Sequence, residues 1–286
     1  MTLPDFMIVG AMKCGTSTLQ AQLAAQDGVF MTTPKEPNFF SDDAVYARGI
    51  DWYRALYDGA APGVLTGEAS THYTKRPTYP DTLARMQHAA QTAGAPLPRL
   101  LYMIRNPLDR AVSHYIHEWT EARMGQDPVA EFQRHPEIAA YSCYGMQIAP
   151  FIEAAGADQV FLTSLEQIKA DPDAEFARIA RFLGLGASAV WQHDMAAQNV
   201  SANRARRLPL QGLLLDNPVA RTLRQTLVPK SLRTRIRARL TMQERPALPP
   251  TLIAGLQERF LEDRARLARQ FPDHPALSLC FPFAGS

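Results

Sequence analysis

The chain has 286 residues, of which 46% are hydrophobic and 20% are charged, a composition typical of globular proteins that bury a large core. Its net charge of +2 gives no indication of a nucleic-acid partner. Its three cysteines do not make a disulfide framework, although the sequence does not exclude a single disulfide between Cys143 and Cys280. No signal peptide and no apolar run of the ~20 residues of a membrane span are visible, so we expect a cytoplasmic protein in a reducing compartment.

The first informative stretch is residues 6–19, which predict a buried strand, a glycine turn and the start of a helix. The apolar run 6–9 is typical of an inner strand of a parallel sheet. Gly10 and Gly15 follow, and glycines let the backbone approach a ligand closely. A helix N-terminus beside a lysine is a site for an anionic group such as phosphate. Hydroxyls stand where this helix would begin, in Thr16, Ser17 and Thr18.

This loop differs from the loop that binds nucleoside triphosphates. In that motif a lysine directly follows the second glycine. Here Thr16 follows Gly15, and the only lysine of the loop is Lys13. A triphosphate site without its lysine would bind the β- and γ-phosphates poorly. The loop therefore suits a single phosphate and a group transferred from it, with a plain tight turn as the structural alternative.

Two further segments place carboxylates where function is expected. Lys35 and Glu36 lie between two prolines, which predict an extended or turned backbone. Residues 64–70 predict a strand ending in a polar turn that contains Glu68. Functional residues gather at the carboxyl ends of parallel strands. The alternatives are a surface loop anchored by its phenylalanines for the first segment and simple turn capping for the second.

The second informative stretch, residues 99–115, predicts a buried strand followed by a helix that begins at Pro107. Arg105 stands at the end of the strand, and Ser113 lies on the helix. A guanidinium makes paired hydrogen bonds to phosphate oxygens, so this arginine and a helical serine can hold a second phosphate. Arg110 shares the helix face of Ser113, and we expect it to form a surface salt bridge.

Strands alternate with helices through this part of the chain, which predicts an α/β fold with a central parallel sheet flanked by helices. A further strand is expected over 160–163. Further helices are expected over 51–57, 81–93, 145–155 and 172–183, and a terminal helix opens at 249–250.

The composition becomes polar and basic from residue 198. We expect a single domain, 1–286, with an α/β core over 1–197 and a basic, helical region that covers the cofactor and acceptor over 198–286. Within it, 221–245 predict a basic amphipathic helix. Such a helix could lie on an anionic membrane surface, cover the active site or accept an acidic substrate, although a solvated face is the commonest use of this pattern.

Together these stretches resemble the sulfotransferases that use 3′-phosphoadenosine 5′-phosphosulfate. Residues 104–115 look like the family's 3′-phosphate element, and 34–40 and 67–70 are similar to further blocks of the heparan-sulfate-type branch and its bacterial relatives. Two phosphate elements in the right order are much more specific than either alone. The residues that look like the 5′-phosphosulfate loop are Lys13, Cys14, Gly15, Thr16, Ser17 and Thr18.

The resemblance implies a P-loop-like sulfotransferase fold and in-line transfer of a sulfuryl group to a hydroxyl, with an amine as the second choice. The acceptor would be a small molecule, a lipid or a carbohydrate. Lys13 would neutralise charge on the departing 5′-phosphate, while the loop amides and hydroxyls hold its other oxygens. Arg105 and Ser113 would bind the 3′-phosphate. No metal is required, because two anchored phosphates and the lysine supply the electrostatics.

Glu36 matches the carboxylate base of the heparan-type enzymes and would take the proton of the acceptor. Glu68 is the second candidate for this role and His72 the third. The heparan-type enzymes commonly have a lysine after the glutamate that matches Glu68, whereas this chain has Ala69. Lys35 is the candidate substitute, and the difference argues against carrying over a heparan-like acceptor.

Residues 199–201 with the arginines at 204, 206 and 207 resemble a cofactor-closing loop of bacterial relatives, so Arg206 is a further candidate for cofactor binding. Two other classes stay open: a P-loop nucleotide kinase, and a non-catalytic protein that binds a nucleotide or a membrane through the basic region. The sequence gives no indication of the oligomeric state.

Overall fold

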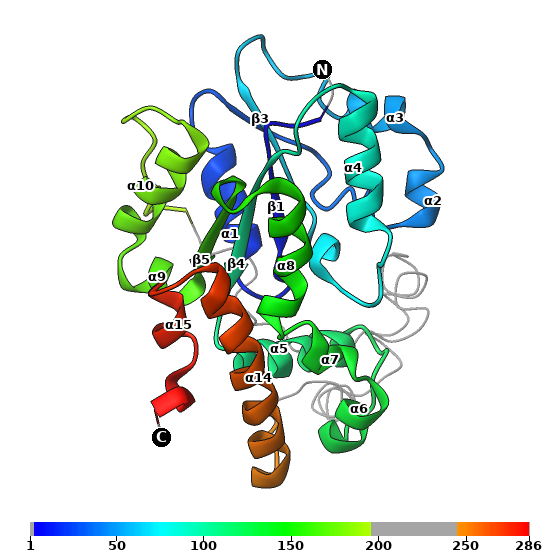
Figure 1. Cartoon of the computed structure of the whole chain (residues 1–286), viewed down its shortest axis with the longest axis vertical. Helices are drawn as coiled ribbons and strands as arrows, with labels where there is room; N and C mark the ends of the chain where they lie inside the picture. Colours follow the sequence, from blue (N-terminus) through cyan, green and yellow to red (C-terminus); the bar gives the residue numbers. More distant parts are fainter. Residues whose placement is uncertain (1–2, 196–244, 286) are drawn as a thin grey trace, which may run out of the picture.

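The computed structural model describes residues 3–195 and 245–285 (Figure 1). Its centre is a five-stranded sheet in the order β2-β3-β1-β4-β5, in which every neighbouring pair is parallel. This arrangement confirms the α/β class and the central parallel sheet. The strands are β1 (Phe6–Gly10), β2 (Val29–Met31), β3 (Leu65–Ala69), β4 (Arg99–Ile104) and β5 (Val160–Ser164).

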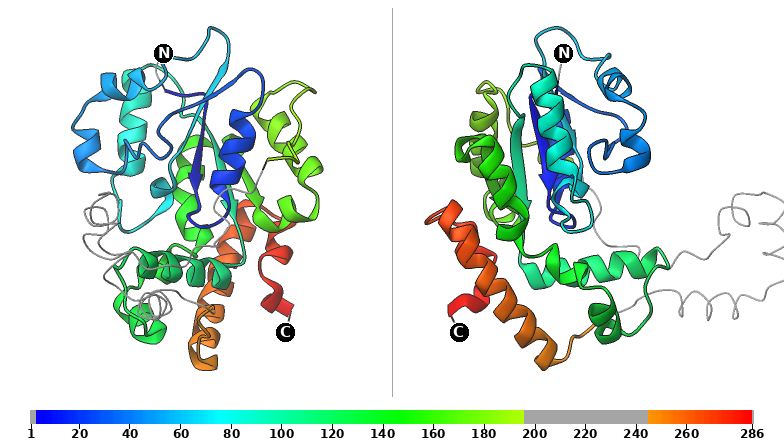
Figure 2. Two further views of the ribbon diagram at one scale, coloured as in Figure 1. Left: turned by 180° about the vertical axis from the view of Figure 1, so that it is seen from behind. Right: turned by 45° about the vertical axis from the view of Figure 1, so that its right-hand side comes forward.

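Helices cover both faces of the sheet. Helix α8 lies in front of the strands in Figure 1, and α14 runs below α8 in the same view. Helix α1 comes to the front when the molecule is turned by 180° (Figure 2). The predicted helices are confirmed as α1 (Thr16–Ala24), α3 (Ile50–Ala55), α4 (Thr82–Thr92), α5 (Pro107–Thr120), α8 (Tyr144–Ala155), α10 (Pro172–Leu183) and α14 (Pro250–Gln270). Shorter elements connect them: α2 (Asp43–Tyr46), η1 (Thr71–Thr74), α6 (Pro128–Arg134), α7 (Glu137–Ala140), η2 (Ala157–Gln159), α9 (Leu165–Ala170), α15 (Ala276–Leu279) and η3 (Pro282–Gly285).

Local signals in the sequence set the ends of α5 and α10. Asn106 accepts hydrogen bonds from the amides of Leu108 and Asp109, and proline occupies the first turn of α5. Asp171 caps α10 in the same way, and Gly184 ends that helix with φ at 77°, a backbone conformation that favours glycine. The cap of α5 fixes the direction of the chain directly after Arg105, one of the predicted phosphate-binding residues.

Helix α14 joins the core through a buried carboxylate. Asp263 accepts hydrogen bonds from the amides of Gly145 and Met146, at 2.7 and 2.8 Å, and so caps the first turn of α8 from outside that helix. Residue 145 has no room for a side chain, since a Cβ there would lie 2.7 Å from the carbonyl oxygen of Asp263. Phe260 and Leu267 of α14 are fully buried in the same apolar core as the sheet.

Residues 196–244 of the chain are outside the described ranges. They include the predicted cofactor-closing loop, with residues 199–201 and the arginines at 204, 206 and 207, and positions 221–244 of the expected amphipathic helix. The cysteines Cys14, Cys143 and Cys280 are free thiols. In the described ranges, no helix is long and apolar enough to cross a membrane. The same ranges contain no group of three or more His, Cys, Asp or Glu side chains placed to hold a metal ion.

Candidate active site

The predicted site residues follow three neighbouring strands. Strand β1 lies between β3 and β4, with Ile8 opposite both Ala69 and Leu101. The strands are parallel, so their carboxyl ends meet at one edge of the sheet. The loop after β1, the η1 segment after β3 and Arg105 after β4 therefore lie side by side at this edge.

The loop after β1 turns sharply into α1. Gly15 has φ at 95°, and a Cβ there would lie 3.0 Å from Cε of Met103, so a side chain at this position would meet both backbone strain and a steric contact. No side chain caps α1, and its first turn contains no acidic residue. Within the described ranges, the amides of Gly15, Thr16 and Ser17 donate no hydrogen bond. The helix N-terminus is therefore open to an anion.

Two neighbouring side chains of this loop, Lys13 and Cys14, have different surroundings. Burial and the charge of Arg105 lower the pKa of Lys13, which has φ at 68°. The thiol of Cys14 is fully buried and lies 3.7 Å from the hydroxyl of Tyr144. Burial raises the pKa of this thiol to about 12. Cys14 therefore places a neutral side chain in the core, and Lys13 supplies the charge of the loop.

Arg105 connects the two predicted phosphate elements. Its Nη1 donates to the carbonyl oxygen of Lys13 at 3.3 Å, and its Nη2 lies 3.6 Å from Oδ2 of Asp109. The next residue is also held, because the amide of Asn106 donates to Glu166 at 2.9 Å. Ser113 is half-buried on α5, the helix that begins just beyond this point. The structure thus brings Arg105 directly to the Lys13 loop.

Glu36 is fixed to the end of β3. Its amide donates to the carbonyl of Ala69 at 3.0 Å, and its Oε1 accepts from Nζ of Lys35 at 2.8 Å and from Oγ1 of Thr71 at 3.2 Å. Burial acts to raise the pKa of this carboxyl, but the charges of Lys35 and Lys75 outweigh it and hold the pKa below its ordinary value. Glu36 is therefore ionised at neutral pH.

A family model described as "Sulfotransferase domain" matches residues 3–228. The chain belongs to this sulfotransferase family. Human heparan sulfate glucosamine 3-O-sulfotransferase 6 is 30% identical over 190 residues, which cover 64% of this chain and 52% of that protein. Human bifunctional heparan sulfate N-deacetylase/N-sulfotransferase 2 is 27% identical over 207 residues, covering 64% and 22%. The chain thus spans about half, or less, of the curated relatives that it matches.

A solved structure shows the same fold. The sulfotransferase from Alicyclobacillus acidocaldarius superposes with a TM-score of 0.67 at 24% identity, covering 97% of this chain and 99% of that one. The predicted sulfotransferase family and the fold are therefore confirmed. The roles of the individual site residues stay predictions.

Glu68, the second candidate for the base of this sulfotransferase, is enclosed by tyrosines. The residue is fully buried, and Oε2 accepts from the hydroxyl of Tyr57 at 3.5 Å. Burial raises the pKa of Glu68 to about 7, against the opposing effect of nearby hydroxyls that include those of Tyr73 and Tyr53. Its Oε1 has no hydrogen-bond partner in the described ranges. This carboxyl is closed off from an acceptor.

His72, the third candidate, stacks on Tyr79 with 4.6 Å between ring centroids. Burial and the charge of Lys75 lower the pKa of His72 to about 4, so the imidazole is neutral at physiological pH. The imidazole becomes positively charged only at strongly acidic pH.

The expectation of a surface salt bridge for Arg110 is wrong. Arg110 is fully buried, and its Nε donates to Oγ of Ser142 at 2.6 Å. Its Nη2 donates to the carbonyl of Ile138 and lies 3.3 Å from Nδ1 of His114. The interior position arises because the segment around 138–142 folds over α5 and supplies acceptors that helix periodicity alone does not reveal.

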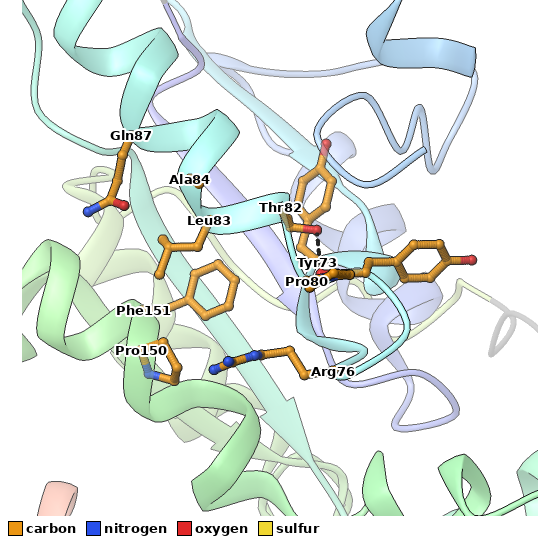
Figure 3. Close-up of a pocket in the computed structure, with 10 residues that line it drawn as sticks. Tyr73, Arg76, Pro80, Thr82, Leu83, Ala84, Gln87, Pro150 and Phe151 are labelled. Carbon is orange, nitrogen blue, oxygen red and sulfur yellow. Dashed lines mark hydrogen bonds between the residues drawn. The ribbon is translucent and has the colours of Figure 1, made fainter. Parts of the chain in front are cut away.

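A separate hollow of about 220 Å³ lies between α4 and α8 (Figure 3). Leu83 and Phe151 approach each other across it, and the guanidinium of Arg76 extends along Pro150. Tyr73 lines this hollow, which therefore borders the tyrosines around Glu68. Arg76 is exposed, in contrast to its neighbour Lys75, which is buried.

Proposed function

We propose that this enzyme transfers the sulfuryl group of 3′-phosphoadenosine 5′-phosphosulfate to a hydroxyl of its acceptor. The observation that carries the proposal is the hydrogen bond from Arg105 to the carbonyl of Lys13. It unites two anion-binding elements beside the open N-terminus of α1. A donor with phosphates at both its 3′ and 5′ positions offers two anions that such a pair of elements can hold at once.

In this proposal each group acts on a stated atom. The amides at the start of α1 and the ammonium of Lys13 stabilise the oxygens of the departing 5′-phosphate. Arg105, with Ser113, binds the 3′-phosphate and so orients the donor. The bond from sulfur to the bridging phosphate oxygen breaks as the bond from sulfur to the acceptor oxygen forms. The carboxylate of Glu36 takes the proton of the acceptor hydroxyl.

The exposure of the two carboxylates supports Glu36 as the base. Its side chain is 31% exposed and is hydrogen-bonded to Lys35 and Thr71, whereas Glu68 is fully buried. A general base must come within hydrogen-bond reach of the proton that it removes. Glu36 meets this requirement without rearrangement of the core, and Glu68 acts instead as a partner of its tyrosines.

The acceptor is proposed as a hydroxyl-bearing molecule, with carbohydrates as the first compounds to test. The relatives named above are a glucosamine 3-O-sulfotransferase and an N-deacetylase/N-sulfotransferase of heparan sulfate. Because these names cover both oxygen and nitrogen as sulfated atoms, an amine stays the second choice.

The experiment is transfer of radiolabelled sulfate from the phosphosulfate donor to a panel of carbohydrate, lipid and small-molecule alcohols and amines. We expect Lys13→Ala to lower kcat about 10²–10³-fold. Arg105→Ala should mainly weaken calorimetric binding of adenosine 3′,5′-bisphosphate. Lys169→Ala and Arg181→Ala remove exposed cations of α9 and α10 and serve as matched controls. Failure of the wild-type protein to bind the bisphosphate, or phosphoryl transfer from ATP with Mg²⁺ in place of sulfate transfer, would overturn the proposal.

A further inference from the structure

Lys75 is a buried cation that forms no salt bridge with any residue the structure describes, although Glu36 acts on it electrostatically from farther away. The residue is only 8% exposed, and its Nζ lies 5.9 Å from the ring centroid of Tyr141. In the described part of the chain, no carboxylate forms a salt bridge with this ammonium and no group accepts a hydrogen bond from it. Burial lowers the pKa of Lys75 to about 8. Because a buried charge without a partner is costly, its retention beside a reaction site needs an explanation.

The backbone holds Lys75 next to the phosphate loop. The residue follows η1, and the hydroxyl of Thr74 donates to the carbonyl of Val9 at 2.8 Å. The contact leaves no space for a side chain at Gly10, where a Cβ would lie 2.0 Å from Oγ1 of Thr74. At the other end of η1, Thr71 donates to Glu36. This short segment therefore spans the distance from the proposed base to the start of the loop that carries Lys13.

Arg110 adds a second cation beside the same aromatic ring. Its Cζ also lies 5.9 Å from the ring centroid of Tyr141, so the two positive groups are no more than twice that distance apart. Nη1 of Arg110 is buried and has no hydrogen-bond partner in the described ranges. The charge of Arg110 contributes to lowering the pKa of Lys75, after the larger effects of burial, which lowers it, and of Glu36, which raises it.

The nearby carboxylates are already engaged. Glu36 accepts from Lys35 and Thr71. Glu118 of α5 lies 2.7 Å from Nη1 of Arg123 and 3.7 Å from Nε2 of His114. Neither carboxylate lies within salt-bridge distance of Lys75. An excess of positive charge therefore stays between Glu36, Tyr141 and the Lys13 loop, and an arriving anion would balance it.

We propose that Lys75 is a further anion-binding residue of the transfer site, whose ammonium binds a negatively charged oxygen beside the reacting hydroxyl. This inference rests on the proposed function, because it places the anion in the sulfuryl-transfer reaction. Two molecules can supply that oxygen: the donor, through the sulfuryl group in transit, or the acceptor, through a carboxylate or sulfate substituent. The chemistry that Lys75 recognises is the same in both cases.

The test compares Lys75→Met and Lys75→Gln, which remove the charge, with Lys75→Arg, which retains it. Arg76→Met is the matched control, because this neighbouring cation is exposed and lies along the hollow between α4 and α8. Binding of adenosine 3′,5′-bisphosphate and the melting temperature report on folding and on the phosphate elements. We expect each variant to bind the bisphosphate within about twofold of wild type, since Lys75 is assigned to neither phosphate element.

Kinetics then separate the two sources of the anion. If the sulfuryl group supplies the oxygen, the neutral variants should lose about 10²-fold in kcat with every acceptor, and Lys75→Arg should recover part of the loss. If the acceptor supplies it, KM should rise about 10-fold or more for anionic acceptors and stay constant for neutral ones, as for loss of one charged hydrogen bond. Unchanged kcat and KM for all acceptors would overturn the proposal. So would a loss of transfer matched by an equal loss of bisphosphate binding, which marks a structural role.

A binding measurement keeps this inference separate from the proposed reaction. With bisphosphate present at saturation, inorganic sulfate should raise the melting temperature of wild type and Arg76→Met more than that of the neutral Lys75 variants. Equal rises would overturn the role of Lys75. Absence of bisphosphate binding in the wild type would instead overturn the proposed function, and the sulfate comparison without bisphosphate would still report on Lys75.

Discussion

The guanidinium of Arg105 donates a hydrogen bond to the carbonyl oxygen of Lys13, with 3.3 Å between the two atoms. This bond connects the end of β4 to the loop after β1, although the residues are 92 positions apart. Asp109 approaches the other terminal nitrogen at 3.6 Å. The guanidinium is therefore oriented before any ligand binds, and preorganised groups need little rearrangement when charge arrives.

Arg105→Lys should weaken binding of adenosine 3′,5′-bisphosphate about 10-fold or more, since a lysine keeps the charge but loses the paired geometry of the guanidinium. Isothermal titration calorimetry measures the effect, with Arg181→Lys on α10 as the control for a change of cation elsewhere. Unchanged affinity in Arg105→Lys would show that this side chain does not contact the 3′-phosphate.

The pH dependence of kcat/KM should identify the base, because this ratio reports the pKa values of the free enzyme. The pKa of Glu36 lies below its ordinary value of 4.5, so kcat/KM should still exceed half of its neutral-pH value at pH 4.5. A base with the pKa of Glu68, about 7, would make kcat/KM fall already below neutral pH.

If His72 were the base, its pKa of about 4 would also make kcat/KM fall only at acidic pH, so a variant must distinguish it from Glu36. Lys35→Met removes the ammonium bonded to Glu36 at 2.8 Å and should move the fall in kcat/KM to higher pH. Glu36→Gln should lower kcat about 10²–10⁴-fold, the usual contribution of general base catalysis. Nearly full activity in Glu36→Gln would remove it as the base.

Glu68 should make the free energy of unfolding depend on pH. Burial raises its pKa from 4.5 to about 7, so between these values the folded protein holds a proton that the unfolded chain releases. The contribution of Glu68 to stability is therefore complete below pH 4.5 and is lost as the pH rises to about 7, on the order of 3 kcal/mol. Urea denaturation at pH 5 and pH 8 should show this loss in wild type, and a smaller one in Glu68→Gln. Equal losses would show that this carboxyl is ionised throughout.

Asp263→Ala should lower the free energy of unfolding by about 3 kcal/mol, because two amides of α8 lose a charged acceptor in a buried position. Glu262→Ala is the control, since the neighbouring side chain is exposed. Denaturant titration gives both values. A similar, small effect of the two variants would show that α14 adds little to the stability of the core.

The sequence was most informative where local chemistry sets the backbone. Gly15 and Pro107 mark the turns after β1 and β4, and the apolar runs mark the inner strands, so the sheet and its main helices could be predicted. Arg110 could not, because the groups that hold it, Ser142 and the carbonyl of Ile138, come from a segment that folds over α5. A one-dimensional helix pattern cannot distinguish a solvated face from one covered later by another segment.

The burial of Lys75 and the tyrosines around Glu68 also could not be predicted from the sequence. A single lysine in a polar run has no signal of its own, and its burial depends on Tyr141, which lies far along the chain. Glu68 was identified by its place at a strand end. The strand end is real, but Tyr53 and Tyr57 from the α3 region enclose the carboxyl, and that depends on tertiary packing.

The cap that Asp263 places on α8 also bears on how the chain is made. The two partners are 118 residues apart, so a nascent chain that has emerged through β5 has α8 without its cap. The apolar surface that Phe260 and Leu267 later cover is exposed at that moment. The cap on α8 and this part of the core can therefore be completed only after translation has passed α14.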